Sequence, residues 1–110
     1  MLALPGKTRL FLYKEATDMR KGFEGLSAIV NLAFKGELTS GAYFIFLNRQ
    51  RNIMKVLYWD SDGLAIWQKR LEKGHFAKCS QNNILLERRE FFMLLEGITP
   101  RRLQKRYKHD

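Results

Sequence analysis

The chain has 110 residues, the length of one domain, and 45% of them are hydrophobic, which excludes a disordered chain. Its apolar runs are all shorter than the roughly 18 residues of a transmembrane helix, which excludes a membrane-spanning segment. The net charge of +9, from 20 Lys and Arg against 11 Asp and Glu, favours a polyanion, either nucleic acid or an anionic membrane surface. Of these two we expect nucleic acid and no membrane partner.

Two features of the sequence bear on its compartment. The single cysteine, Cys79, cannot form an internal disulfide, which suits a reducing cytoplasm. The first ten residues, MLALPGKTRL, lack the charged and apolar regions of a secretory signal. We therefore expect a cytoplasmic protein.

The first part of the chain predicts a strand followed by a helix. Residues 8–14, TRLFLYK, form a short β-type run. Either Thr17 or Asp18 is a good N-cap, and apolar residues then recur at helical spacing, so we expect a helix over residues 18–35. Gly36, directly after this stripe, predicts the end of the helix.

The middle of the chain predicts three antiparallel strands joined by short turns. The run AYFIFL at residues 42–47, followed by a polar loop at 48–52 and an apolar run at 53–59, predicts a hairpin. The acidic turn DSDG at 60–63 then leads to a third strand at 64–70. The first of these strands carries large side chains on both faces. One face can lie under the predicted helix, so the other needs a second helix or a partner.

The last part of the chain predicts a short strand, a second helix and a basic tail. A loop, in which residues 75–78 are a candidate strand, precedes a strand at 84–86 and a helix at 87–96. We therefore expect an α+β fold: a mainly antiparallel sheet of four to five strands with two packed helices. Residues 1–98 are expected to form a single domain and residues 99–110 a basic C-terminal tail.

Four segments, in this order, are specific enough to indicate a family: TDMRKGFEGL at residues 17–26, FIF at 44–46, KVLYWDSDGLAIWQKRLEKGHF at 55–76 and MLLEGI at 93–98. Together they resemble the TnpB accessory protein, also called the Orf-two-like protein, of bacterial insertion sequences of the IS-66 type. This family is unrelated to the RNA-guided nuclease that shares the name TnpB.

The resemblance implies a role in transposition and a bacterial source, with the protein associated with the nucleoid if it binds DNA. Elements of this type encode a separate transposase that carries the acidic catalytic triad, and the accessory protein is needed for movement of the element. The resemblance implies no defined biochemical activity for the accessory protein, so the mechanism stays open. It covers residues 8–98; the segment at 79–83 lacks the tryptophan and proline common in the family, and the tail after Ile98 lies outside the shared pattern.

Two aspartates, Asp60 and Asp62, are the candidate catalytic pair. Two-metal phosphodiester chemistry needs several carboxylates around ions about 3.5–4 Å apart, and a D-x-D turn could supply two of them, but no third partner has a persuasive spacing. The preferred alternative is a turn in which the Asp side chains bond backbone amides and Gly63 takes a positive φ. His75 and His109 have no Cys or His partner at metal spacing. We therefore expect no catalytic residue, no metal and no cofactor.

Ten basic residues are the candidate nucleic-acid contacts. The first pair lies at the predicted helix start, where it favours a nearby anion, with pairing to Asp18 or Glu24 as the alternative. The second pair lies at the hairpin tip, where it can follow phosphates or serve solubility alone. The third lies beside Trp67, as part of a stacking surface for single strands or as the solvated edge of a core tryptophan. The rest lie in the tail, which can contact phosphates or be a solvated terminus. In chain order the ten are Arg20, Lys21, Arg49, Arg51, Lys69, Arg70, Arg101, Arg102, Lys105 and Arg106.

The sequence thus predicts a non-enzymatic accessory protein required for transposition of an insertion sequence. We expect it to bind DNA, or the complex of DNA with the element's transposase, through a basic surface. Phosphate contacts would dominate, so binding should depend little on DNA sequence. One alternative is a protein–protein adaptor that recruits the transposase through the aromatic sheet face. A second is a nuclease-like enzyme that uses Asp60 and Asp62.

Overall fold

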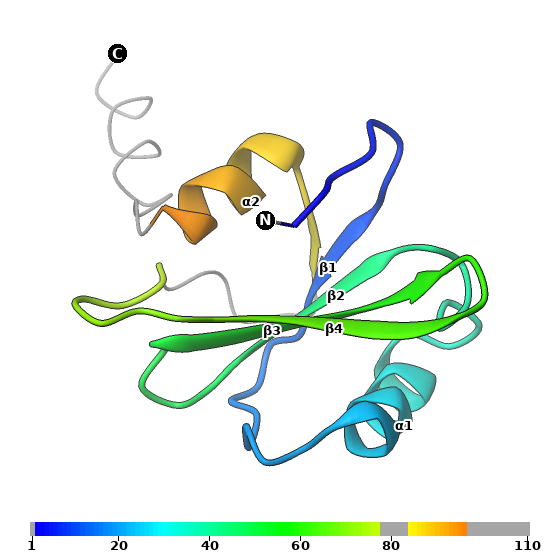
Figure 1. Ribbon diagram of the computed structural model, residues 1–110, viewed down its shortest axis with the longest axis horizontal. Helices are drawn as coiled ribbons and strands as arrows, with labels where there is room; N and C mark the ends of the chain where they lie inside the picture. The colour runs from blue at the N-terminus through cyan, green and yellow to red at the C-terminus, as the bar shows by residue number, and fades with distance from the viewer. Residues whose placement is uncertain (1, 78–83, 97–110) are drawn as a thin grey trace.

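The computed structural model describes residues 2–77 and 84–96 of the chain (Figure 1). Neither helix in this part of the chain is long and apolar enough to cross a membrane. The elements in chain order are β1 (Leu10–Leu12), α1 (Phe23–Ala33), β2 (Tyr43–Leu47), β3 (Ile53–Asp60), β4 (Gly63–Arg70), β5 (Ile84–Leu86) and α2 (Arg88–Leu95).

The strands form one sheet with the spatial order β4-β3-β2-β1-β5. Strands β1 and β2 are parallel, because the chain passes through α1 and returns to the same end of the sheet before β2 starts. The other neighbouring strands are antiparallel. Figure 1 shows α1 on one side of this sheet and α2 on the other. The predicted α+β fold with a mainly antiparallel sheet is therefore confirmed.

Helix α1 covers one face of the sheet through its apolar stripe. Phe44 and Phe46 of β2 point to this face, and neither is exposed to solvent. The ring centroid of Phe11 lies 5.1 Å from that of Phe34 and 5.7 Å from that of Phe44, which packs the end of the helix against two strands. Aromatic pairs at these distances add to the free energy gained by burial alone.

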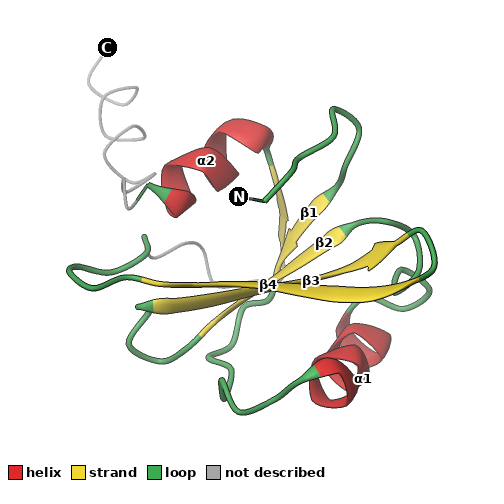
Figure 2. Cartoon of the chain, viewed as in Figure 1, coloured by secondary structure: helices red, strands yellow, loops and turns green. Residues whose placement is uncertain are grey.

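Helix α2 covers the opposite face (Figure 2). Phe91 and Leu94 of this helix are buried there, together with Phe76 from the segment after β4. The alternate side chains of β2 that point to this face are Tyr43, Ile45 and Leu47. The large side chains on both faces of β2 predicted a second covering helix, and that helix is α2.

Helix α1 begins at Phe23, so the predicted start near residue 18 is wrong. The carboxylate of Asp18 caps a local turn instead, where it accepts a 2.9 Å hydrogen bond from the backbone N–H of Arg20. Two backbone carbonyls of this turn accept hydrogen bonds from the ammonium group of Lys55 on β3, which holds the turn apart from the helix. The N-cap residue is Gly22, whose position has no side-chain cap.

The turn between β3 and β4 lies at residues 60–63, as predicted, but its positive φ belongs to Ser61, at 58°, and not to Gly63. The N–H of Asp62 donates to the carbonyl of Asp60, which makes Ser61 the central residue of a γ-turn. The expectation for Gly63 is wrong because the hydrogen bond that closes the turn joins Asp60 and Asp62. The residue between them, Ser61, therefore takes the positive φ.

The candidate strand at 75–78 is absent from its described part, residues 75–77. Phe76 leaves the sheet's hydrogen-bond pattern and buries its ring against the α2 face. Lys78 lies outside the described residues. The apolar character of Phe76 therefore reflects burial in the core and not a strand.

Candidate nucleic-acid interface

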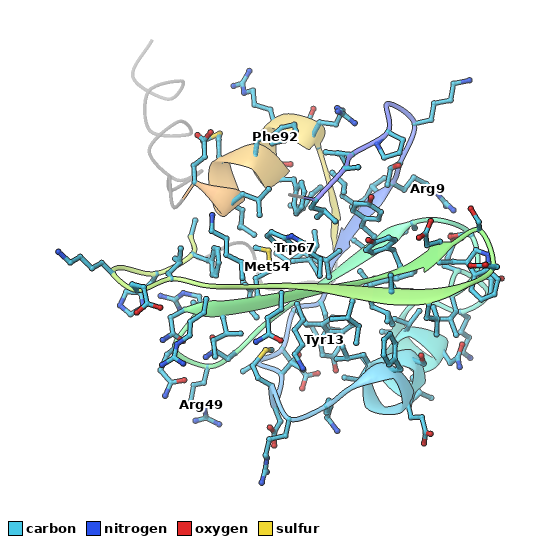
Figure 3. The ribbon with its side chains drawn as sticks, in the orientation of Figure 1. Arg9, Tyr13, Arg49, Met54, Trp67 and Phe92 are labelled. Atoms are coloured by element: carbon cyan, nitrogen blue, oxygen red, sulfur yellow. The ribbon has the colours of Figure 1, made fainter. Side chains whose placement is uncertain are left out.

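Asn48 closes the loop between β2 and β3. Its Oδ1 accepts hydrogen bonds from the N–H groups of Asn52 and Ile53 at 2.9 and 3.0 Å, and its Nδ2 donates to Asn52 Oδ1 at 2.7 Å. Arg51 has a φ of 56°, which turns the chain back toward β3. Arg49 is exposed at the loop tip and points away from the sheet (Figure 3). A fixed backbone thus presents a cationic side chain to solvent.

The segment after β4 packs around this loop. The N–H of Phe76 donates to the carbonyl of Arg51 at 2.6 Å, and Nδ1 of His75 lies 2.7 Å from the carbonyl oxygen of Gln50. Arg70, the last residue of β4, lies opposite the first residue of β3. The basic residues at the end of β4 therefore share one end of the sheet with the hairpin loop.

We call this region the basic end, and its cations are Arg49, Arg51, Lys69, Arg70 and Lys73. Residues 48–52 and 69–76 contain one acidic residue, Glu72. Within the described residues none of the five cations forms an ion pair. Such an uncompensated group of charges raises the local concentration of anions and suits the phosphates of a nucleic acid.

The five cations differ in how accessible they are. Nζ of Lys69 donates to the carbonyl of Leu95 at 3.3 Å, at the C-terminal end of α2, where the helix dipole favours a cation. Arg51 is half-buried, and its Nε is buried with no hydrogen-bond partner in the described residues. The exposed side chains of Arg49, Arg70 and Lys73 are therefore the best placed to meet an external anion.

The structure brings Arg20 and Lys21 to the same end of the sheet, on its α1 side. The N–H of Thr17 donates to the carbonyl of Leu47, the last residue of β2, at 2.8 Å. The helix-dipole argument for an anion at Arg20 and Lys21 is wrong, since both residues precede α1. The guanidinium of Arg20 forms an ion pair with Asp18 at 2.6 Å, so its charge is compensated inside the protein.

The contact between Asp18 and Arg20 shifts the titration of both groups. Hydrogen bonds from the side chain and the backbone N–H of Arg20 lower the pKa of Asp18 to about 2. The same side-chain hydrogen bond raises the pKa of Arg20. The stem of Lys21 packs against Gly25 in the first turn of α1: a Cβ at Gly25 would approach the Cβ of Lys21 to 3.0 Å, so glycine provides room for the lysine stem.

The acidic turn lies at the other end of the β3–β4 hairpin from the basic end. In residues 2–77 and 84–96, no group of three or more His, Cys, Asp or Glu side chains could hold a metal ion. Asp60 and Asp62 are both exposed. Trp67 is partly buried against the α2-face core, which favours the core interpretation of this tryptophan over a stacking surface.

The tail residues predicted to contact nucleic acid lie outside the described residues. These are Arg101, Arg102, Lys105 and Arg106. Their role stays a prediction that rests on the sequence alone.

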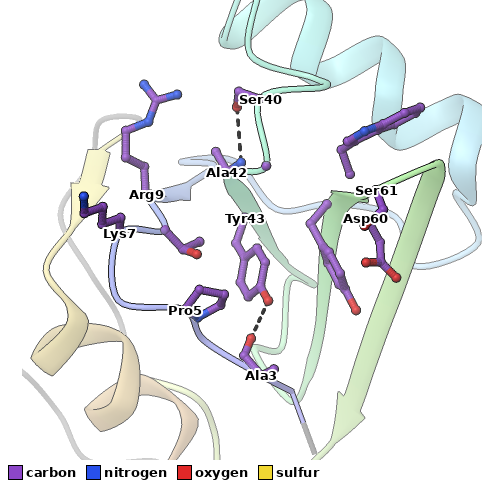
Figure 4. Close-up of a pocket in the computed structure, with 13 residues that line it drawn as sticks. Ala3, Pro5, Lys7, Arg9, Ser40, Ala42, Tyr43, Asp60 and Ser61 are labelled. Atoms are coloured by element: carbon purple, nitrogen blue, oxygen red, sulfur yellow. Dashed lines mark hydrogen bonds between the residues drawn. The ribbon is translucent and has the colours of Figure 1, made fainter.

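An open cavity lies at the end of the sheet that carries the turn with Asp60 and Asp62, which we call the acidic end (Figure 4). It has a volume of about 570 Å³ and lies between the N-terminal segment and the start of β2. The hydroxyl of Tyr43 donates to the carbonyl of Ala3, and burial raises the pKa of Tyr43, with smaller contributions from Tyr58 and Asp60. No sequence signal finds this cavity, because it depends on where the irregular first residues fold back.

The fold and the basic end together define a small basic α+β protein built on one sheet. The model of a protein family described as IS66 Orf2-like protein matches residues 8–105. The chain belongs to this family, whose members are accessory proteins associated with transposition and are not known enzymes. The match extends past Ile98, where the motif resemblance ends, into the basic tail.

Two proteins of Sinorhizobium fredii (strain NBRC 101917 / NGR234) are similar to this chain over most of its length. Uncharacterized protein y4hO is 30% identical over 110 residues, which cover 98% of this chain and 96% of y4hO. Uncharacterized protein y4jC is 26% identical over 100 residues, which cover 89% of this chain and 86% of y4jC. No solved structure matches the chain significantly.

Proposed function

We propose that this protein assists transposition by binding DNA through its basic end, alone or in complex with the transposase, and performs no chemistry of its own. The observation that carries the proposal is the exposed group of Arg49, Arg70 and Lys73, which has no ion pair within the described residues. Hydrogen bonds of the hairpin fix the backbone positions of Arg49 and Arg70 before any ligand arrives. Less conformational entropy is then lost on binding.

The distribution of charge along the sheet supports a defined orientation on DNA. The turn with Asp60 and Asp62 lies at the end of β3 and β4 that is remote from Arg70. A polyanion attracts one end of the molecule and repels the other, so the hairpin loop faces the phosphates. Contacts of this kind position a protein without reading base edges, and weak sequence preference is the expected result.

A fluorescent DNA duplex titrated at several salt concentrations tests the proposal. We expect binding at low ionic strength, with an affinity that falls linearly with salt on logarithmic axes. The double variant Arg49→Ala/Arg70→Ala should bind more weakly and lower the magnitude of the slope by roughly 0.9 for each phosphate that the variant no longer neutralises. Absence of salt-sensitive binding by the natural sequence would refute the proposal.

A matched control removes the same charge elsewhere. Lys7 and Lys35 are exposed cations outside the basic end, and Lys7 lines the cavity at the acidic end. The double variant Lys7→Ala/Lys35→Ala should retain nearly the full slope. Equal reductions of the slope in the two double variants would mean that total charge, and not the basic end, determines binding.

Deletion of residues 101–110 separates the contribution of the tail. If the tail contacts phosphates, its deletion lowers the magnitude of the salt slope further. The effect of Arg49→Ala/Arg70→Ala should persist in the shortened chain, because hydrogen bonds among residues 48–76 hold the basic end together.

An adaptor that recruits the transposase is the second candidate function. The aromatic sheet face first expected to serve this purpose is covered, since α1 and α2 bury the two faces of the sheet. The apolar side chain of Phe92 on α2 is 45% exposed and supplies a different contact point. Co-purification of transposase that is abolished in Phe92→Ser, without any DNA binding, would favour the adaptor.

A further inference from the structure

Strand β4 is an unprotected edge of the sheet. It has eight residues, is paired with β3 in one unbroken register, and has no other strand neighbour among the described residues. Residues 64–67 contain neither a charged residue nor a proline. Figure 2 shows β4 in the foreground, with the two helices above and below the sheet. Natural proteins usually interrupt or cover an exposed edge of this length, because its open backbone groups accept another strand.

The pairing with β3 fixes which backbone groups of β4 are open. The N–H of Leu71 donates to the carbonyl of Asn52, and the same register continues through the strand. In an antiparallel ladder, alternate residues turn their N–H and C=O groups to opposite sides. The residues whose backbone groups point outward are therefore Leu64, Ile66, Gln68 and Arg70.

We propose that β4 pairs antiparallel with β4 of a second copy of this chain, about a two-fold axis at Ile66. In this register Ile66 faces the partner's Ile66, and Leu64 faces the partner's Gln68. Each copy contributes the same strand, as a two-fold symmetric interface requires. The two five-stranded sheets then form one continuous sheet.

Charge at the two ends of β4 identifies a second copy as the occupant. The acidic turn precedes the strand, and basic residues end it, so an antiparallel copy places unlike charges together. In the register centred on Ile66, Asp62 lies opposite the partner's Arg70. A register shifted by two residues in one direction would place Asp62 opposite the partner's Glu72, and a shift in the other direction would place it opposite the partner's Gln68. Only the register centred on Ile66 pairs Asp62 with Arg70, so a charge exchange at these two residues tests it.

The pairing leaves two cations of the basic end for DNA, Arg49 and Lys73, whereas Arg70 then pairs with the partner's Asp62. Arg49 lies in the loop between β2 and β3 and Lys73 follows β4, so neither is part of the β4 edge. Because the pairing is antiparallel, the two hairpin loops lie at opposite ends of the combined sheet. A measurement of molecular mass tests the dimer, and its result does not depend on the result of the DNA titration.

Sedimentation equilibrium over a range of protein concentrations tests the proposal. We expect the natural sequence to approach twice the 13.0 kDa mass of one chain. In Gln68→Pro the proline removes an outward N–H that no described residue uses, so the variant should stay a monomer. The matched variant Gln68→Ala keeps this N–H and should dimerise normally. A monomeric natural sequence, or a dimer that persists in Gln68→Pro, would overturn the proposal.

A charge exchange tests the register and does not depend on the folding of the proline variant. The single variants Asp62→Arg and Arg70→Asp should each weaken the dimer severalfold, because like charges then face each other. The double variant Asp62→Arg/Arg70→Asp should recover it. Failure of the double variant to recover, with circular dichroism equal to that of the natural sequence, would exclude this register.

Discussion

The buried ammonium group of Lys55 donates a 2.8 Å hydrogen bond to the carbonyl oxygen of Met19, 36 residues earlier in the chain. A second 2.8 Å bond reaches the carbonyl of Lys21. Lys55 is only 8% exposed and makes no ion pair within the described residues. Backbone carbonyl dipoles therefore replace the water around this cation, and the turn before α1 folds around it.

Replacing Lys55 by methionine should lower the free energy of unfolding by about 2 kcal/mol, since a hydrogen bond to a charged group contributes about 1.5–3 kcal/mol. Methionine keeps most of the side-chain volume and removes the donor. Urea denaturation measures the change, and faster hydrogen exchange at Lys21 N–H should localise it. Lys73→Met, at an exposed loop position, should stay within about 0.5 kcal/mol of the natural sequence. Equal stability of both variants would contradict a role for the Lys55 hydrogen bonds.

Asp18 should titrate with a midpoint near its pKa of about 2, well below its ordinary value of 3.8. Because folding lowers the pKa of Asp18, its ionised carboxylate stabilises the folded state. This stabilisation is fully present above pH 3.8 and is lost as the pH falls toward 2. The carboxyl carbon shift of Asp18 measures the midpoint by NMR. In Arg20→Gln the midpoint should rise toward 3.8, because the main hydrogen-bond donor is removed. Arg49→Gln, which alters a different turn, should leave it unchanged.

Ser61→Gly should stabilise the protein. Ser61 has a φ of 58° at the centre of a γ-turn, a conformation that costs a residue with a Cβ on the order of 1–3 kcal/mol. Glycine relieves this strain but loses about 0.5–1 kcal/mol through its flexible unfolded state, so the net gain should be on the order of 1 kcal/mol. Thermal unfolding measures the change. Ser61→Ala keeps the Cβ and should give no gain; a gain equal to that of glycine would show that the backbone is unstrained.

Ser27→Ala should also stabilise the protein. The hydroxyl of Ser27 on α1 is buried and has no hydrogen-bond partner among the described residues, and an unsatisfied buried polar group costs about 1–3 kcal/mol. Alanine removes the hydroxyl and favours the helix. Ser40→Ala should instead lower the free energy of unfolding. Ser40 Oγ donates to the carbonyl of Glu37 at 2.7 Å and accepts from the N–H of Ala42, and alanine removes both hydrogen bonds. Chemical denaturation compares the two; a less stable Ser27→Ala would contradict the prediction.

The strands were predictable because their signals are local. Alternating apolar residues and short polar turns gave the strand at Tyr43–Leu47 and its two hairpin partners within a residue or two of their ends. The start of α1 was not predictable, since Asp18 is an equally good cap for a helix or a turn. Lys55 decides between them from a distant strand, and its sequence context resembles that of any exposed lysine.

The candidate interface was predictable in part. Antiparallel pairing of the three strands brings Arg49 and Arg70 to the same end of the sheet, so their proximity follows from the order of the strands alone. The ion pair that compensates Arg20 could only be named as an alternative, because two acidic residues lie within reach in the sequence. The cavity beside Tyr43 was missed because the segment that lines it, residues 3–9, has no regular structure before β1.

The spatial order of the strands has a consequence for synthesis of the chain on the ribosome. Residues 10–70 contain β1 to β4 and α1, so most of the sheet and one covered face can form first. The opposite face, which includes Ile45 and Met54, stays exposed until α2 at residues 88–95 has emerged. A nascent chain that has been synthesised past residue 70 but not past residue 95 exposes this apolar face to water. Molecular chaperones bind exposed apolar surfaces of this kind. Folding of this protein therefore depends on α2 packing against the strands that were made first.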